Sequence, residues 1–189
     1  MPPLRTNVAS VWRDELLTQL DFYWERTLWP RLAGLTDEEF FWQPVANCWT
    51  VHPRSDGPAV VDWTWPEPDP PPVTTIAWRM AHISIGVFGL RASAHFGDGS
   101  LALADAPWPT SAAAGLTLLS EQHDAWCAGV RGLDDDDLRR PVGGAEGDWA
   151  SHPMAALVLH INREVMHHGG EIALLRDLYR AGFAGQQHG

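Results

Sequence analysis

The chain has 189 residues, of which 45% are hydrophobic and 20% are charged, and its formal net charge is −11. This length and composition predict one globular domain, residues 1–189, that can bury a core without disulfide bonds. Only 13 Lys and Arg stand against 24 Asp and Glu, so the chain would repel a nucleic-acid backbone or an anionic membrane surface, and neither is an expected partner.

Two cysteines, Cys48 and Cys127, are too few for a disulfide framework and lack the CxxC spacing of a redox or zinc motif. We expect both to be reduced thiols. The first fifteen residues, MPPLRTNVASVWRDE, contain no apolar signal core, and no apolar run is long enough to cross a bilayer. The expected location is the cytoplasm.

The first predicted helix covers about residues 10–33. Its apolar residues recur at helical spacing, and Ser10 is the expected N-cap. Pro30 should end or kink this helix near residues 32–34. Thr36 and Glu39 then form a TxxE capping box, which predicts a short helix running to about Trp42.

Residues 47–73 hold seven of the fifteen prolines and three tryptophans. A long loop of this kind inside a compact domain is typically a lid, a binding loop or a subunit contact. We expect it to lie over the mouth of a pocket. The alternative is a loop that only packs its aromatic side chains on the helices.

A second helix is predicted over about residues 74–96, capped by Thr74 or Thr75. One stripe of this helix carries His82 followed by Gly86, Gly89 and Ser93. Small residues let another helix approach closely, so the imidazole of His82 can reach a facing helix. A lone histidine there would ordinarily be a satisfied core residue, and Arg79 indicates that this end of the stripe opens to water or to an anion.

The third predicted helix covers about residues 110–131, with Thr110 as its cap. The following stretch, GLDDDDLRRPV, resembles the earlier GLTDEEFFWQPV. The same pattern after the first and third helices predicts two similar helix pairs. We therefore expect an all-α fold, a four-helix bundle with a long Pro/Trp-rich loop between helices one and two. The acidic run 134–137 lacks the ligand spacing of a calcium loop, so we interpret it as the N-terminus of a solvated helix.

The fourth predicted helix, about residues 152–182 with Ser151 as its cap, places Glu164 and His168 one turn apart on its core-facing edge. Burying both groups is costly unless each has a partner, and a metal ion shared with His82 would serve both. Two imidazoles and one carboxylate suit zinc, nickel, iron or manganese, with a coordination position left open. His160, His167 and Glu171 lie towards the rim, where they could orient the ligands, act as a general base, or be solvated.

Two stretches of the chain, HINREVMHHGGEIALLRDLY and LTDEEFFWQPV, together with a histidine in the second helix, resemble the DinB-like (DinB/YfiT) superfamily of four-helix bundles. The resemblance implies a divalent metal, zinc or nickel, held at the three motif positions, which fall on His82, Glu164 and His168. Many members have histidine where this chain has Glu164. A glutamate there is similar to the branch of mycothiol-dependent maleylpyruvate isomerases.

The resemblance implies a transferase or isomerase that uses a low-molecular-weight thiol, such as mycothiol, on an electrophilic small molecule, and it implies a homodimer. In this hypothesis His167 or Glu171 orients ligands or moves a proton, and three tryptophans shape the apolar pocket: Trp49, Trp63 and Trp65. Two other functions fit the same residues. One is a metal-dependent hydrolase that activates water, and the other is a non-catalytic metal-binding dimer of a stress response.

Overall fold

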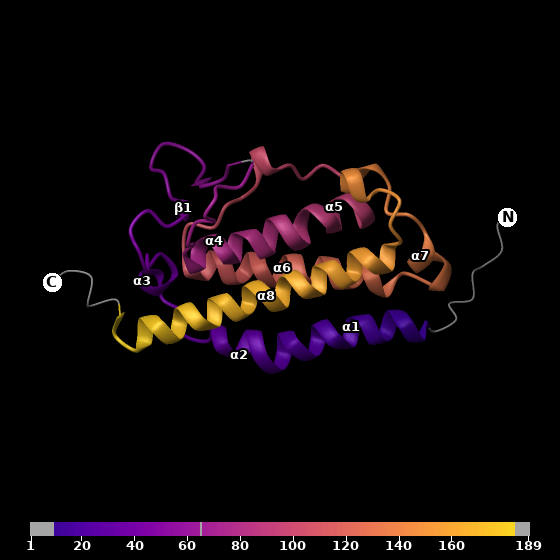
Figure 1. Ribbon diagram of the computed structural model, residues 1–189, viewed down its shortest axis with the longest axis horizontal. Coiled ribbons are helices and arrows are strands. Elements are labelled where there is room, and N and C mark those ends of the chain that lie inside the picture. Colours follow the sequence, from indigo (N-terminus) through magenta and orange to yellow (C-terminus); the bar gives the residue numbers. More distant parts are fainter. Residues whose placement is uncertain (1–9, 65, 184–189) are drawn as a thin grey trace.

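A computed structural model of the chain describes residues 10–64 and 66–183, and within them four long helical segments lie side by side (Figure 1). The first consists of α1 (Val11–Tyr23), a π-helical stretch (Trp24–Leu28) and α2 (Trp29–Leu32). The second consists of α4 (Ile76–Ala81), a π-helical stretch (His82–Gly89) and α5 (Leu90–Phe96). The third is α6 (Ala112–Arg131) and the fourth is α8 (Met154–Arg180).

The helix α8 packs against α1 on one side and against α4 and the following π-helical stretch on the other, and α6 contacts the same two segments. Apolar side chains from all four segments are fully buried between them, among them Leu20, Met80, Leu119 and Ile161. Removing each such side chain from water contributes about 1.5–3 kcal/mol, which makes this shared interior the main source of stability. No helix in the described part of the chain is long and apolar enough to cross a membrane.

The four long helical segments begin and end within two residues of the positions predicted from the sequence. Ser10 and Thr75 are N-caps, as predicted. Two other predicted caps are wrong. The N-cap of α6 is Ser111 rather than Thr110, because the Ser111 hydroxyl accepts a hydrogen bond from the backbone N–H of Ala114. The N-cap of α8 is Pro153 rather than Ser151.

Two short helices follow the first and third long segments: α3 (Asp37–Phe40) and α7 (Asp135–Arg139), which lie at opposite ends of the molecule (Figure 1). The predicted capping box is only half formed in α3. The Thr36 hydroxyl accepts from the Glu39 N–H, but the Glu39 carboxylate turns inward to Arg176. A complete box forms at α7 instead, through Asp134 and Asp137.

The side chains of Glu39 and Arg176 are 3% and 0% exposed, and the guanidinium donates two hydrogen bonds of 2.7 and 2.9 Å to the carboxylate. The same guanidinium also donates to the backbone carbonyl of Arg31. A buried charge pair is tolerated only where both partners are hydrogen-bonded. This pair fixes α3 against the C-terminal half of α8.

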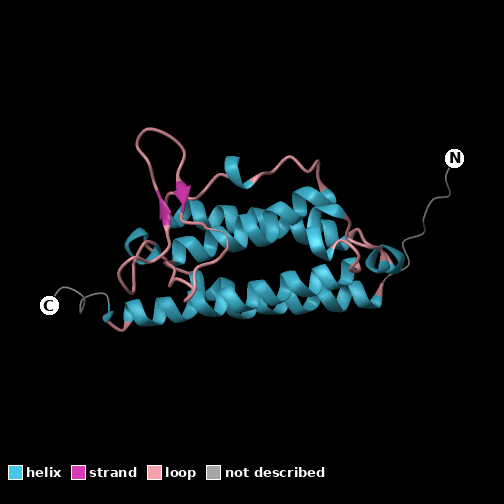
Figure 2. Ribbon diagram, turned by 45° about the horizontal axis from the view of Figure 1, so that its top comes forward, coloured by secondary structure: helices cyan, strands magenta, loops and turns pink. Residues whose placement is uncertain are grey.

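The Pro/Trp-rich loop contains a strand pair that the predicted all-α fold did not include. Strand β1 (Val51–His52) pairs antiparallel with β2 (Val60–Val61), with Val51 opposite Val61. The structure is therefore mostly helical with one small two-stranded sheet. Figure 2 shows this hairpin and the 97–111 connection, with its short 3₁₀ helix at Leu103–Asp105, on the same side of the helices.

Gly169 sets the distance between α8 and α1. A Cβ atom at this position would collide with the Tyr23 hydroxyl group, which donates a hydrogen bond of 3.2 Å to the Met166 carbonyl. The neighbouring Gly170 has open space where a side chain would lie. Only the first of these two glycines is therefore required by packing.

Candidate metal centre

The structure brings together the three side chains that the sequence singles out as metal ligands. His82 is the first residue of the π-helical stretch, and Glu164 and His168 lie one turn apart on α8. One ligand atom from each of the three lies within 4.8 Å of the other two. The two imidazole rings are perpendicular, with centroids 4.7 Å apart. Side chains distant in sequence thus converge on one point between two helices.

The two ring nitrogens of His168 face different carboxylates. Nδ1 lies 2.7 Å from Glu171 Oε2, and Nε2 lies 3.3 Å from Glu164 Oε2. Because a carboxylate only accepts, the short contact requires that Nδ1 carries the proton and donates it to Glu171. In the neutral ring Nε2 then presents a lone pair towards Glu164, which also has only lone pairs to offer.

Two acceptors that face each other need a positive species between them. A proton on Nε2 would satisfy the His168–Glu164 pair, but it would place a charged ring against His82, whose centroid is only 4.7 Å away. A divalent cation satisfies all three donor atoms at once. Two imidazoles and one carboxylate form a common three-ligand set for catalytic zinc, which keeps its fourth position open. The donor chemistry of these residues therefore fits the predicted metal.

Glu171 fixes the orientation of the His168 ring and is itself held by Arg79, whose Nε lies 2.9 Å from Oε2. Burial raises the pKa of Glu171, but the His168 hydrogen bond and the Arg79 charge outweigh burial and lower this pKa below its ordinary value. The group is therefore ionised at neutral pH. A carboxylate that accepts from the distal nitrogen of a metal-binding histidine is a recurrent support for such ligands.

The side chains of His167, His168 and Glu171 form a second possible cation-binding group. That group fits a metal less well, because Glu171 already pairs with Arg79 and Nη1 of the same guanidinium lies 3.2 Å from His168 Nδ1. A cation there would meet the arginine charge. His167 is 64% exposed, and its Nε2 lies 3.6 Å from Glu171 Oε1, so it lies at the rim, where the sequence places it.

The imidazole of His82 is held between aromatic rings and a glycine. It stacks on Trp78, with centroids 5.1 Å apart and planes within 9°, and Trp63 lies parallel to both rings. A Cβ atom at Gly86 would lie 3.2 Å from Nδ1 of His82. Burial, together with His168 and Arg79, lowers the pKa of His82 to about 3. The ring is therefore neutral at pH 7 and has a lone pair available for a metal.

A cavity of about 760 Å³ lies beside His82, which forms part of its wall. The hairpin contributes residues 58–61 and Trp63, the 97–111 connection contributes Leu103–Ala106 and Trp108, and the second helical segment contributes Trp78, Gly86, Leu90 and Arg91. The lining is mostly apolar. The Pro/Trp-rich loop therefore borders a pocket, as expected, and also packs its aromatic rings on the helix, as the alternative proposed.

The three predicted pocket tryptophans have different positions. Trp63 lines the cavity. Trp49 packs on Trp78, with centroids 5.8 Å apart, and hydrogen-bonds through its backbone to residues 73 and 75. Trp49 therefore supports the wall from behind. Trp65 lies outside the described residues.

Sequence reasoning missed several residues of the wall. Trp78 precedes His82 by one helical turn, and that i, i+4 spacing could have identified it. The 97–111 connection gave no such signal, because its approach to the hairpin depends on the fold.

His160 is 40% exposed, and its Nδ1 lies 3.6 Å from Glu164 Oε1. The Nη2 atom of Arg163 lies 2.8 Å from the same nitrogen. It flanks the candidate ligands and is not one of the three converging groups.

The chain was compared with known protein families. A family model described as the DinB superfamily matches residues 19–172, a range that includes the candidate ligands on both helical segments. No curated protein and no solved structure matches the chain.

Proposed function

The chain belongs to the DinB superfamily, and on that premise we propose that it is a metal-dependent enzyme that transfers a low-molecular-weight thiol to an electrophilic small molecule. The fold we propose for it is the four-helix bundle expected from the sequence, made of the four long helical segments. The thiol would be of the mycothiol type, as the glutamate at position 164 implies by its similarity to the isomerase branch.

One observation supports this proposal most directly: His82 belongs both to the three converging ligands and to the wall of the 760 Å³ cavity. Three protein ligands leave a zinc ion an open coordination position. Because His82 borders the cavity, that position would be accessible to a molecule bound there. A purely structural metal site would instead be closed by four protein ligands.

The proposed metal is zinc, or else nickel, held by His82, Glu164 and His168. When bound, it would supply a charge that deprotonates a coordinating thiol at neutral pH, although a free thiol has a pKa of about 8.5. Glu171 would hold the His168 ring in the ligand orientation. His167, exposed at the rim beside Glu171, would accept the released proton and pass it to solvent.

The cavity wall would select and position the electrophile. Trp63, Trp78 and Leu90 offer an apolar surface, and Arg91 and Asp105 add one charge of each sign to the same lining. A pocket of this kind favours a largely apolar molecule with few polar groups. Trp49, behind Trp78, would keep the wall rigid and would not contact the bound molecule.

A metal-dependent hydrolase is the second candidate, because water could occupy the same open position. The two reactions differ in their requirement for a thiol. Turnover of an activated ester without added thiol would favour hydrolysis, whereas turnover that depends on thiol concentration would favour transfer. The third candidate, a non-catalytic metal-binding dimer, predicts no turnover with or without added thiol. The cavity beside His82 disfavours it.

The decisive experiment compares the wild-type protein with the His168→Ala variant. Elemental analysis of the purified wild-type protein should find zinc or nickel, and thiol-dependent consumption of an electrophile should be measurable. His168→Ala should lose both the metal at this centre and the thiol transfer. Metal-binding stoichiometry unchanged by the substitution would refute the ligand assignment, and loss of metal with retained activity would refute the catalytic role.

Location and assembly are also proposals. We propose a cytoplasmic homodimer that acts on a small molecule and has no nucleic-acid or membrane partner. The negative charge of the chain supports the last point. Sedimentation analysis of the purified protein tests the dimer.

A further inference from the structure

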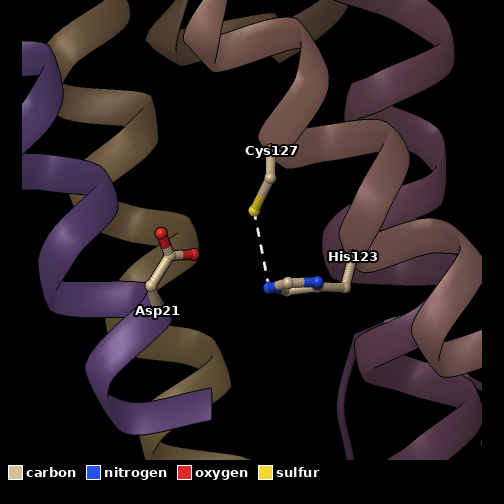
Figure 3. Close-up of side chains that lie close together, drawn as sticks. All are labelled: Asp21, His123 and Cys127. Carbon is tan, nitrogen blue, oxygen red and sulfur yellow. Dashed lines mark hydrogen bonds between the residues drawn. The ribbon is translucent and has the colours of Figure 1, made fainter. Parts of the chain in front are cut away.

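Another group of side chains that could hold a metal ion lies between α1 and α6, and its members stand on helices that carry none of the ligands of the first centre. Asp21 of α1 points towards Cys127 and His123 of α6, as Figure 3 shows. One ligand atom from each of the three residues lies within 4.8 Å of the other two. His123 and Cys127 are spaced i, i+4, so both project from one face of α6.

The His123 ring is fixed with one nitrogen directed at the cysteine. Nδ1 lies 3.1 Å from the Asp124 carboxylate, so it carries the proton, and Nε2 presents its lone pair to the Cys127 sulfur at 3.4 Å. Trp24 stacks on the imidazole with centroids 3.8 Å apart and planes within 8°. The ring is therefore held in the tautomer and the orientation that a metal ligand needs.

Asp21 supplies the third donor and connects the group with solvent. Its side chain is 38% exposed, and Oδ2 lies 3.7 Å from a guanidinium nitrogen of Arg131. At this distance the arginine orients the carboxylate from the rim without enclosing it. The His123 side chain is only 8% exposed, and Cys127 is fully buried. An ion could therefore reach the sulfur and nitrogen from the side of Asp21.

The same residues could be interpreted as a catalytic cysteine, because Cys127, His123 and Asp124 follow one another in hydrogen-bond contact. The surroundings of the sulfur oppose this interpretation. Cys127 has no exposed surface, and burial together with the charge of Asp21 raises the pKa of its thiol to about 12. A nucleophilic cysteine needs a low pKa and access to its substrate. A metal ion that arrives from the side of Asp21 displaces the thiol proton as it binds, so the high pKa of the free thiol does not prevent coordination.

We propose that Asp21, His123 and Cys127 form a second metal site, which binds zinc or another thiophilic divalent cation. One thiolate, one imidazole and one carboxylate are ligand types that zinc accepts in a tetrahedral site, while magnesium and calcium prefer oxygen ligands alone. Binding releases the Cys127 proton to solvent and forms a sulfur–metal bond. Water would complete the set of four ligands.

The occupied site would join α1 to α6 across the core. A metal ion that binds the folded state and not the unfolded state stabilises the folded state by mass action. Asp21, His123 and Cys127 do not line the 760 Å³ cavity, so this site would act on stability, whereas the first centre would act on chemistry. The proposal is independent of the proposed enzymatic activity, because no ligand is shared between the two groups.

Cobalt(II) is the probe, because thiolate coordination to it produces a sulfur-to-metal charge-transfer absorption in the near ultraviolet. The wild-type chain should bind two equivalents of cobalt and show this absorption. Cys127→Ser should lose the absorption and one equivalent. His168→Ala should lose the other equivalent and keep the absorption, so failure at either site is recognised separately.

Two further variants control the experiment. Cys48→Ser removes the other thiol, which donates to the Val45 carbonyl in the loop, and should keep both equivalents and the absorption. Asp21→Asn keeps the buried residues of α6 intact and should weaken binding of the thiolate-linked cobalt tenfold or more, with circular dichroism confirming the fold. Absence of the absorption in the wild-type protein, or its persistence in Cys127→Ser, would overturn the proposal.

Discussion

The Glu171 carboxylate lies 2.7 Å from Nδ1 of His168 and so determines which nitrogen of that ring faces Glu164 and His82. The carboxylate is itself paired with Arg79 at 2.9 Å. A chain of three charged or polar groups thus runs from the cation Arg79 to the free lone pair of His168. The ligand geometry depends on this chain as much as on the three ligands.

Replacing Glu171 with glutamine should weaken zinc binding by about 10–100-fold, because the ring loses the charged acceptor that orients it. Competition titration with a chromophoric chelator measures the affinity. Glu121→Gln is the matched control, since it makes the same change of charge on an exposed position of α6 and should leave the affinity unchanged. Equal affinity in both variants would show that Glu171 has no part in holding the ring.

Gly86→Ala should weaken zinc binding while the fold is retained. The new Cβ atom would lie 3.2 Å from His82 Nδ1 and displace the ring by a few tenths of an ångström. Alanine in place of glycine in a helix otherwise stabilises by about 0.5–1 kcal/mol. Metal affinity should therefore fall while the thermal stability of the same sample is unchanged or higher. A variant with wild-type affinity would mean that the ring has room to move.

Adjacent glycines of α8 should respond in opposite ways to the same substitution. Gly169→Ala forces a methyl group against the Tyr23 hydroxyl and should destabilise the fold by about 1–3 kcal/mol. Gly170→Ala meets open space and should stabilise it by about 0.5–1 kcal/mol. Urea unfolding of the two variants measures both effects. Similar changes for both would contradict the close approach of α8 and α1.

Trp63→Ala should raise the KM for an apolar electrophile by roughly tenfold or more, since the side chain lines the cavity and a buried aromatic contact contributes about 1.5–3 kcal/mol. Trp49→Ala removes a ring of the same kind that only supports Trp78. Its effect on KM should be smaller, and its effect on thermal stability should be comparable. Steady-state kinetics on both variants make the comparison, and a larger KM effect at Trp49 would contradict the assigned lining.

Glu39→Gln should destabilise the chain by about 3–5 kcal/mol, because it leaves the Arg176 guanidinium buried beside an uncharged amide. The double variant Glu39→Leu with Arg176→Met should recover most of the loss, since it removes both charges. Asp136→Ala breaks the exposed Arg139 pair and should leave the unfolding free energy within experimental error of wild type. Chemical denaturation compares the three. A small loss in Glu39→Gln would mean that water reaches the pair.

The helices and the ligand pair of α8 were predictable because both depend on local spacing. Apolar residues three and four apart placed four long helices within two residues, and the i, i+4 relation of Glu164 and His168 fixes their contact wherever the helix lies. The meeting with His82 was a weaker prediction, supported by the small residues that follow it. These are local properties of the sequence.

Other features depend on tertiary contacts and gave no local signal. Glu39 looked like part of a capping box, but a buried arginine 137 residues away competes for its carboxylate. The two π-helical stretches were not foreseen, and the one that starts at His82 changes which side chains share its face. The Asp21, His123 and Cys127 group was also missed, because the i, i+4 spacing of His123 and Cys127 gives only two donors and nothing local in the sequence brings Asp21 of α1 to them.

The cavity wall and the proposed metal ligands come from different kinds of structure. His82, Glu164 and His168 stand on long helices, whereas much of the wall comes from the 47–73 hairpin segment and the 97–111 connection. Insertions and substitutions are tolerated in connecting segments far more readily than in packed helices. In the proposed enzyme, substrate preference would therefore diversify in these two connections while the ligands on the helices stay constant, and exchanging the connections between relatives would test whether selectivity changes with them.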